Sequence, residues 1–371
     1  MKGLVIWPYS ECRSTMATYQ SLSDKIGASA YFAILRDNKT CGMALRAKTG
    51  FRTDEFAGVD KTYVGLDFNI GLEIINTHPG WDHLFGEFQD SAVTRRLIYE
   101  AKKRGSRIIV ACESPCNMFY GVKRVAKEAY MRLVLPFLSR KVVQCADAYV
   151  NYSGADDAAR KFCRWPANKI FPFGYFPPPI EGSKSVERKS NSNFFILSTG
   201  ILTKHRGADI LLKALKLLHD WGVEYSAVIT QEGELLGDLR RYAKKYSLPV
   251  NFPGRVPISE LIKMYETCSV FVGAGRSEPW GMRLNDALNC GAPLIISAGM
   301  GGKKLVEDNE CGLICKANDP QDMAMKIKLL ATDSTIYNRV AHNAFRAAEN
   351  ISPERKSCEI VALMRDVGWM S

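Results

Sequence analysis

The chain of 371 residues repeats one pattern in its two halves, on either side of a proline-rich tract. In each half, short apolar runs alternate with amphipathic stretches of helical period. This alternation predicts parallel strands in one sheet with helices packed on its faces. Because the chain is also too long for one ordinary hydrophobic core, we expect two domains. The predicted fold class is therefore α/β, with two doubly wound, Rossmann-like domains.

The positions of the apolar runs give the expected elements. In the first half we predict strands at 3–7, 30–35, 72–76, 107–112 and 148–152, and helices at 16–26, 92–104 and 122–135. In the second half we predict strands at 193–198, 225–230, 250–252, 270–273 and 293–297, and helices near 208–219, 234–246, 259–267, 282–289 and 321–330. Ligands of such sheets bind beyond the carboxyl ends of the strands, so we expect the domains to face each other across a cleft.

The domain boundary is predicted in the tract 171–192, where four prolines precede a polar Gly/Ser/Lys/Asn segment. That composition is typical of a linker. We accordingly expect an N-terminal, acceptor-side domain at 1–177, a linker at 178–192 and a C-terminal, nucleotide-binding domain at 193–352. The remaining residues, 353–371, are expected to form a helical tail that packs back on the N-terminal domain.

Composition excludes several classes of protein. The hydrophobic fraction of 46% and the charged fraction of 24% are those of a globular protein. No apolar run approaches the ~20 residues that span a bilayer, and residues 1–7 are interpreted as a first strand rather than a signal peptide. The eleven cysteines are scattered and odd in number, which favours free thiols over disulfides or a zinc site. We therefore expect a cytoplasmic protein.

One region carries most of the net charge of +11: residues 95–141 contain 12 basic and 3 acidic side chains. Nucleic acid, an anionic membrane or an acidic substrate are all partners for such a region. Residues 122–134 also place apolar side chains on one helical stripe, with most basic residues beside it. We predict peripheral attachment to the inner face of an anionic membrane, with no nucleic acid as partner. Alternatively, the stripe packs on the protein's own sheet.

The segment 276–297, RSEPWGMRLNDALNCGAPLIIS, predicts a binding site. Glu278 precedes a turn at Trp280 and Gly281, after which a helix begins and a strand follows. Backbone N–H groups at the start of a helix attract an anion, and a neighbouring carboxylate accepts hydrogen bonds from sugar hydroxyls. Asp286 lies eight residues beyond Glu278, which predicts a position two turns along the helix, roughly on the same face.

This segment resembles the signature of glycosyltransferase family 4, in which two acids separated by seven residues precede Ala-x-x-x-Gly-x-Pro. Glu278 and Asp286 stand at the two acidic positions. The resemblance implies a GT-B fold and retaining, metal-independent transfer from a nucleotide sugar, with neither a metal nor a cofactor. It also implies that the first acid contacts the donor sugar and the second binds ribose. Asp286 is one methylene shorter than the usual Glu.

Two further segments resemble the family, so that the match covers roughly 194–332. In STGILTKHRG, at 198–207, Ile201 stands where the family has a diphosphate-binding Arg, and Arg206 stands at its Lys position. Lys204, in the same loop, is expected to supply the missing charge. The stretch 252–265 resembles the family's base-binding Gly-Arg-Val. The remaining donor-binding residues implied are Arg255, Val256, Trp280, Gly281 and Met282.

The first half resembles the family only in outline. The family's Gly-Gly loop is replaced by 8–15, where Arg13 is a candidate phosphate contact. Glu113 follows the strand at 107–112, where a His is common, and His78 is expected at the end of the strand at 72–76. We therefore predict Glu113 and His78, with Glu278, as catalytic residues.

Together these features predict a retaining glycosyltransferase. It would move a sugar from a UDP or GDP donor to a glycan or lipid-linked acceptor in cell-surface polysaccharide synthesis. Two alternatives stay open: a non-catalytic subunit that binds a nucleotide sugar, and a nucleotide-sugar epimerase of the same fold. A nicotinamide-dependent oxidoreductase is disfavoured, because the run SAGMGG at 297–302 lacks the full glycine spacing.

Overall fold

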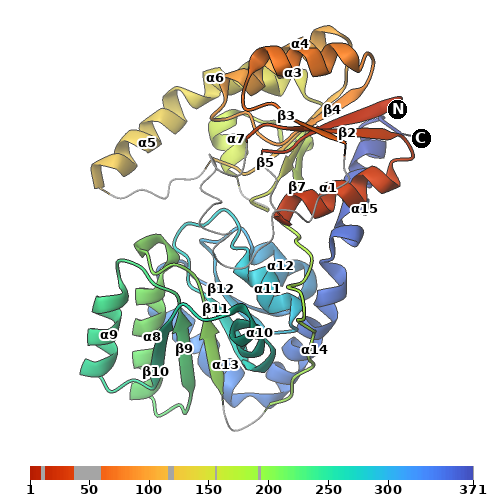
Figure 1. Cartoon of the computed structure of the whole chain (residues 1–371). Coiled ribbons are helices and arrows are strands. Elements are labelled where there is room, and N and C mark those ends of the chain that lie inside the picture. Colours follow the sequence, from red (N-terminus) through yellow and green to blue (C-terminus); the bar gives the residue numbers. More distant parts are fainter. Residues whose placement is uncertain (10–12, 37–59, 116–120, 155–156, 191–193, 371) are drawn as a thin grey trace. The chain divides into compact units, whose positions relative to one another are not determined.

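The computed structural model describes residues 1–9, 13–36, 60–115, 121–154, 157–190 and 194–370. The chain divides into two compact units (Figure 1). The first comprises Met1–Pro178 together with Pro353–Ser371, and the second is Pro179–Ser352. Each unit is a parallel sheet flanked by helices, as the alternating pattern predicts.

The first unit contains a seven-stranded parallel sheet in the order β3-β2-β1-β4-β5-β6-β7. Its strands are β1 (Gly3–Trp7), β2 (Ser29–Ile34), β3 (Lys61–Tyr63), β4 (Asp82–Phe85), β5 (Ile108–Cys112), β6 (Ala148–Asn151) and β7 (Ile170–Pro172). Its helices are α1 (Arg13–Lys25), α3 (Phe68–Thr77), α4 (Ala92–Lys103), α5 (Gly121–Leu133), α6 (Leu135–Cys145), α7 (Ala158–Cys163), η1 (Ala167–Lys169) and α15 (Pro353–Asp366). The order reverses between β1 and β4, both of which are wholly buried.

The strand predicted at 72–76 is wrong, because these residues belong to α3. The Asp67 carboxylate accepts hydrogen bonds from the backbone N–H groups of Asn69 and Ile70, which fixes the start of a helix. Ile74 and Ile75 are buried on one side of that helix. A short apolar run does not distinguish a strand from a buried helix face, and here the N-terminal cap decides.

The last helix, α15, completes the first unit by packing on α1. The buried hydroxyls of Ser21 and Ser357 are hydrogen-bonded at 2.9 Å. Beyond the helix, the Arg107 guanidinium pairs with Asp82 and also donates to the backbone carbonyls of Gly368 and Trp369. The end of the chain is therefore fixed to the amino ends of β4 and β5.

The second unit contains a six-stranded parallel sheet in the order β10-β9-β8-β11-β12-β13. Its strands are β8 (Phe195–Ser198), β9 (Ser226–Thr230), β10 (Val250–Gly254), β11 (Val270–Gly273), β12 (Leu294–Ser297) and β13 (Gly312–Cys315). Its helices are η2 (Lys204–Arg206), α8 (Ala208–Asp220), α9 (Leu236–Lys245), α10 (Ile258–Thr267), α11 (Arg283–Asn289), α12 (Lys303–Asn309), α13 (Pro320–Thr332) and α14 (Ser334–Asn350). The order reverses between β8 and β11.

A close backbone approach joins the two strands at this reversal. Gly207, at the start of α8, has φ +74°, and a methyl group placed there would lie 1.9 Å from the carbonyl oxygen of Ala274. Only glycine fits such a contact. The loop after β8 and the loop after β11 are therefore held against each other.

The segment that composition assigns to a linker is bound along the second unit. The Arg188 guanidinium is buried and donates to the carbonyl oxygens of Cys268, Cys290 and Tyr265, at the ends of α10 and α11. Cationic groups are favourable at helix C-termini, where carbonyl oxygens lack partners within the helix. The Val186 N–H also donates to Cys290. This part of the segment is thus fixed in place.

Candidate functional site

The candidate site is the carboxyl edge of the second sheet, where the strand order reverses. Open α/β sheets bind ligands at such reversals, because the loops of the two strands separate there. The loop after β8 carries Gly200 and Arg206, and the loop after β11 carries Glu278. The Glu278 N–H donates to Gly299, which follows β12, at 3.0 Å. Loops from three strands therefore surround Glu278.

The Glu278 carboxylate lies between two arginines. Its Oε1 pairs with the Arg206 guanidinium. Arg283, the first residue of α11, donates from Nη2 to Oε2 at 2.9 Å and from Nη1 to Oε1 at 3.2 Å. The side chains of Glu278 and Arg283 are 7% and 9% exposed, and that of Arg206 is 30% exposed. We call these three residues the charged triad.

Sequence reasoning missed Arg283. Its position in the signature segment is one that the resemblance assigns to no function, so the motif gave no reason to select it. A second signal was available, because Arg283 begins the helix that follows the Trp280–Gly281 turn and lies five residues after Glu278. From there a long side chain reaches back to the preceding loop.

A second ion pair joins the loops after β8 and β11. Arg276 donates to both oxygens of Asp209, in the first turn of α8, at 2.7 and 2.6 Å. Burial raises the pKa of Asp209, but the hydrogen bonds and the charge of Arg276 outweigh burial and hold that pKa below its ordinary value. Burial and the neighbouring Arg206 lower the pKa of His205, which is therefore neutral near pH 7.

Asp286 lies in the first turn of α11 rather than two turns along a helix shared with Glu278. The helix begins only at Arg283, so the predicted helical relation between the two acids is wrong. Asp286 is half-buried, and its charge adds to burial in raising the pKa of the Tyr265 hydroxyl. The Thr199 and Tyr265 hydroxyls are hydrogen-bonded at 3.0 Å. Asp286 therefore borders the loop after β8 near Thr199.

The predicted role of Trp280 as a donor-binding side chain is not compatible with its burial. The residue is 2% exposed, and its indole N–H donates to the Asn285 side chain at 2.8 Å. Its carbonyl oxygen accepts from the Gly302 N–H at 3.1 Å. Trp280 anchors the turn before α11. Gly281 and Met282 follow it at the start of that helix, where their predicted positions hold.

The other predicted donor contacts lie on the same edge or nearby. Lys204 is exposed in η2, and its carbonyl oxygen accepts a hydrogen bond from Arg276. Arg255 and Val256 follow β10, two strands from the reversal, and Arg255 pairs with Glu232 at 3.4 Å. Arg13 begins α1 in the first unit, but its side chain lies outside the described part of the chain.

The two predicted catalytic residues of the first unit lie at opposite edges of its sheet. Glu113 is exposed and follows β5 at the carboxyl edge, as expected. His78 ends α3 and precedes β4, so it lies at the amino edge and the predicted position is wrong. Its Nδ1 lies 2.8 Å from the carbonyl oxygen of Ile74, and its ring lies edge-on to Trp81. These contacts indicate a structural histidine.

Glu87, which sequence reasoning did not select, lies near Glu113. It follows β4, and its Oε1 accepts a hydrogen bond from the Asp90 N–H at 3.0 Å. Although part of the residue is exposed, protein surrounds its carboxyl group, and this burial raises the pKa of Glu87 to about 7. Gln89 donates to the carbonyl oxygen of Glu113. The carboxyl edge of the first sheet thus holds an exposed acid, Glu113, and a second acid, Glu87, whose pKa is raised by burial.

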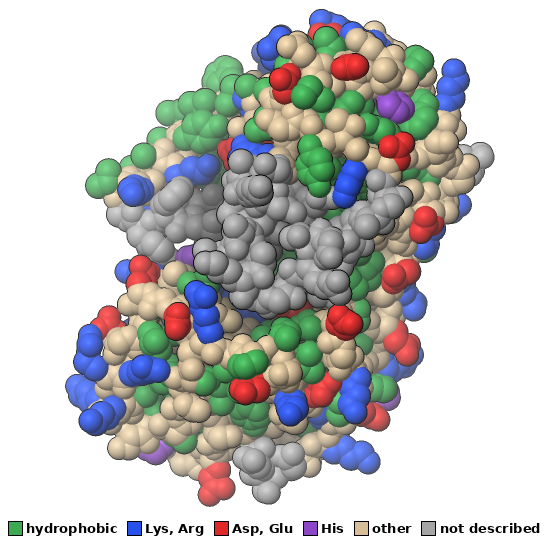
Figure 2. Space-filling view, in the orientation of Figure 1, with side chains coloured by type: hydrophobic (Ala, Val, Ile, Leu, Met, Phe, Trp, Pro, Cys, Tyr) green, Lys and Arg blue, Asp and Glu red, His purple; other side chains and the backbone are tan. Residues whose placement is uncertain are grey.

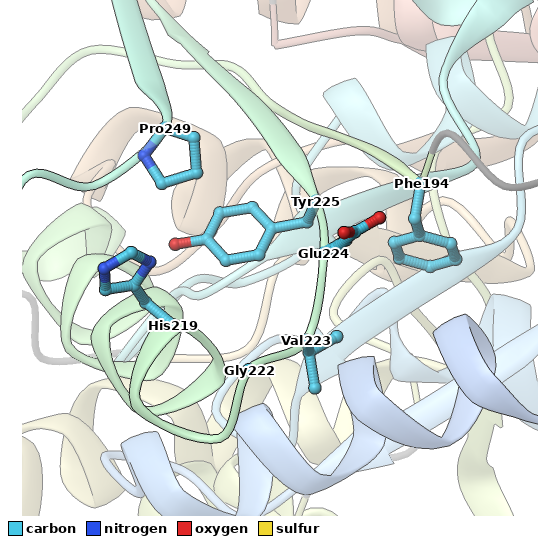
Figure 3. Close-up of a pocket in the computed structure, with 7 residues that line it drawn as sticks. All are labelled: Phe194, His219, Gly222, Val223, Glu224, Tyr225 and Pro249. Carbon is cyan, nitrogen blue, oxygen red and sulfur yellow. The ribbon is translucent and has the colours of Figure 1, made fainter.

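A cavity of about 520 Å³ lies at the opposite edge of the second sheet, at the amino ends of β8, β9 and β10 (Figure 3). Its lining residues are Phe194, His219, Gly222, Val223, Glu224, Tyr225 and Pro249. Figure 3 shows the Tyr225 hydroxyl directed toward the side of His219 and Pro249. That hydroxyl donates to the carbonyl oxygen of Leu215 at 2.8 Å. The cavity lies away from the loops that carry the triad, and its polar groups give no constellation for catalysis.

Within the described residues, no group of three or more His, Cys, Asp or Glu side chains is arranged to hold a metal ion. Eight of the eleven cysteines are described, and all eight are free thiols. Burial raises the pKa of Cys268 to about 11 and that of Cys311 to about 12. Such thiols stay protonated near neutral pH and act as small apolar side chains.

Comparison with known proteins decides the family of the second unit. Residues 180–347 match the family model described as glycosyl transferases group 1. These residues form a group 1 glycosyltransferase domain. An uncharacterised glycosyltransferase of Methanocaldococcus jannaschii is 25% identical over 162 residues, which are 43% of this chain and 45% of that protein. The GDP-mannose-dependent α-(1-6)-phosphatidylinositol dimannoside mannosyltransferase of Mycobacterium tuberculosis is 24% identical over 174 residues, which are 47% of this chain and 44% of that protein.

The chain thus spans about half the length of the curated relatives it matches. Solved structures extend the likeness to both units. Anabaena HepE in complex with UDP has a TM-score of 0.68 at 13% identity, covering 99% of this chain and 100% of that one. The lipopolysaccharide outer core galactosyltransferase WaaB gives 0.67 at 11% identity, with 99% of each chain covered. At such identities the likeness shows the fold, which is GT-B.

Proposed function

We propose that this chain is a retaining glycosyltransferase, using a UDP or GDP sugar and a glycan or lipid-linked acceptor. The charged triad is the observation that carries the proposal. It lies in a group 1 domain, at the edge where a doubly wound sheet binds nucleotides. Two guanidinium groups there are suited to the negative charge of a leaving diphosphate. HepE is described in complex with UDP, and the mycobacterial relative is named for GDP-mannose.

In the proposed reaction, the bond between the sugar C1 and the β-phosphate oxygen breaks as the acceptor oxygen bonds to C1 on the same face. The acceptor proton passes to the leaving phosphate, and no metal takes part. Arg206 would stabilise the charge that develops on the diphosphate. Glu278 would accept hydrogen bonds from sugar hydroxyls, and Asp286 would hold the ribose. The resemblance to family 4 supports these roles and the retention of configuration.

The test is release of nucleoside diphosphate. UDP-, GDP- and ADP-sugars are first compared by the thermal shift that each produces, because a ligand of the folded state raises apparent stability. Acceptor candidates are then added with the best donor. We expect free nucleoside diphosphate and a product with the donor's anomeric configuration. A chelator should leave the rate of this transfer unchanged. Donor binding without transfer to any acceptor would favour a non-catalytic binding subunit, and an altered sugar without an acceptor would favour an epimerase.

A surface of the first unit supports attachment to a membrane. Apolar side chains of α5 and α6 face solvent: Val122 is 85% exposed, Phe137 77%, Val125 69% and Leu133 67%. The alternative that this stripe packs on the protein's own sheet is therefore wrong. Figure 2 shows hydrophobic and basic side chains together over α5. No helix in the described part of the chain is long and apolar enough to span a membrane.

We propose that this surface binds the anionic inner face of a membrane, where a lipid-linked acceptor of a cell-surface polysaccharide would be available. Lys123, Arg124, Lys127 and Arg132 each contribute on the order of 1 kcal/mol near such a surface. Vesicle flotation measures the attachment. We expect binding to anionic but not neutral vesicles, weakened by salt and lost in Phe137→Asp. The control is Met325→Asp, which places the same charge on an exposed apolar residue of the second unit. Equal binding to both vesicle types would contradict the proposal.

A further inference from the structure

The charged triad carries more positive than negative charge. Arg206 and Arg283 bring two guanidinium groups to the single carboxylate of Glu278, so the three side chains carry a formal net charge of +1. A largely buried cationic cluster is stabilised when an anion binds beside it.

Arg283 also has hydrogen-bonding capacity that Glu278 does not use. A guanidinium carries five N–H donors, and the carboxylate takes one from Nη1 and one from Nη2. Its Nε is buried, and among the described residues no acceptor lies within hydrogen-bond distance of it. A buried donor without an acceptor is costly, which indicates that a ligand or solvent atom is its partner.

The Arg283 guanidinium lies against the loop after β8. A methyl group placed on Gly200 would lie 3.0 Å from Nη1 and 3.4 Å from Cζ of Arg283. Gly200 has φ +123°, a region that disfavours any other residue. The next residue, Ile201, is 48% exposed and contributes no charge. The guanidinium that lies beside Gly200 and Ile201 therefore comes from α11.

We propose that Arg283 binds the diphosphate of the donor, from the start of α11, in the space beside Gly200. This inference rests on the proposed function and assigns a ligand group to a side chain that the sequence signature leaves without one. Glu278 holds the guanidinium in a fixed orientation, and the remaining N–H donors meet phosphate oxygens. Arg206 is the second and more exposed cation of the same subsite.

The experiment measures binding by calorimetry of a nucleoside, its monophosphate and its diphosphate, in the uridine or guanosine series that wild type prefers. We expect Arg283→Leu to weaken diphosphate binding by about 10- to 100-fold, from the roughly 1.5–3 kcal/mol of a charged hydrogen bond. Nucleoside binding should stay unchanged. Arg241→Leu, on α9, removes an equally positive but exposed side chain and should leave all three affinities unchanged.

The decisive variant restores the lost positive charge from a different position, in the loop after β8. Ile201→Arg, added to Arg283→Leu, places a guanidinium in the same space and should restore most of the diphosphate affinity. A purely structural Arg283, which only holds Glu278, would not be replaced in this way, so the absence of rescue overturns the inference. Equal weakening for nucleoside and diphosphate overturns it as well.

Two measurements separate this inference from the proposal on which it rests. If wild type binds neither UDP nor GDP, the proposed function fails and the inference fails with it. If wild type binds a diphosphate and Arg283→Leu binds it equally well, only the inference fails. Should Arg283→Leu not fold, Arg283→Lys retains a charge for Glu278, and we expect it to lose part of the diphosphate affinity while nucleoside binding is kept.

Discussion

The carboxyl edges of the two sheets differ in how their charged groups are held. In the second unit, Glu278 and Arg283 are almost fully buried and bound to each other, and Arg276 is bound to Asp209. In the first unit, Glu113 is exposed, and Glu87 has a raised pKa because of burial. One edge is thus organised before any ligand arrives, as expected for a site that binds a constant chemical group. Among the described residues of the other edge, the acid that follows β5 is exposed, and no comparable pair of buried charges is found.

The largest expected effect tests whether the second edge depends on its central acid. Glu278→Gln leaves two arginines without their carboxylate, which costs about 3–5 kcal/mol when one partner of a buried pair is removed. It also misplaces the donor sugar, for which we expect a loss of roughly a hundredfold in turnover. Chemical denaturation and initial rates measure the two effects.

The matched control is Glu232→Gln, which breaks a pair with Arg255 on the same edge. Both side chains of that pair are more than half exposed, so the loss should stay below about 1 kcal/mol. If Glu278→Gln were as stable and as active as Glu232→Gln, the charged triad would have no role in organising the site.

A smaller effect is expected at Asp286, which belongs to the same edge but lies outside the triad. Asp286→Ala should weaken donor binding by roughly 1.5–3 kcal/mol, if its carboxylate accepts hydrogen bonds from ribose. Turnover at saturating donor should change less. Asp286→Glu restores the family's usual length and is expected to keep binding. Calorimetry with wild-type affinity for Asp286→Ala would show that the ribose is held elsewhere.

The carboxyl edge of the first sheet is tested with Glu113, which lies at that edge, and His78, which lies at the opposite edge. Glu113→Gln should lower kcat about tenfold, because that factor corresponds to the free energy of roughly one hydrogen bond. Donor affinity should change little. His78→Asn should leave both parameters unchanged, because His78 lies at the amino edge. A loss of kcat in His78→Asn, with Glu113→Gln unaffected, would reverse this assignment.

The smallest effect is a pH dependence of the first unit's stability. The pKa of Glu87 is about 7 in the folded state against 4.5 ordinarily, so the folded state holds the proton more tightly. This contribution to stability is fully present below pH 4.5 and is lost as the pH rises through 7. Because part of the residue is exposed, we expect this contribution to the free energy of unfolding to be on the order of 1 kcal/mol. The melting temperature of wild type should fall between pH 6 and 8 more than that of Glu87→Gln; equal falls would contradict it.

The sequence predicted the fold class and the main strands because their apolar runs are buried on both faces, as in β1 and β5. It failed at α3, where a side-chain cap at Asp67 outweighs a β-branched apolar run. It also omitted β4, whose four residues include Asp82 and His83. Both errors come from short segments, in which composition carries little information.

The candidate site was predicted as far as its motif extends. Glu278 and Arg206 lie together at the expected edge, because their segments follow β11 and β8 at the reversal of strand order. Arg283 was missed because the motif assigns no function to its position. Its contact with Gly200 joins residues more than eighty positions apart, and a single sequence does not reveal such a contact. Trp280 was assigned to the ligand because a motif does not distinguish a buried aromatic anchor from a contact.

The docking of α15 on α1 has a consequence for how the protein is made. The first unit is assembled from two segments, and its last helix follows the whole of the second unit in the sequence. During synthesis, α1 therefore has no α15 to pack against until residues 179–352 have left the ribosome. The second unit, by contrast, is encoded without interruption. The first unit therefore stays incomplete for as long as the second is being synthesised.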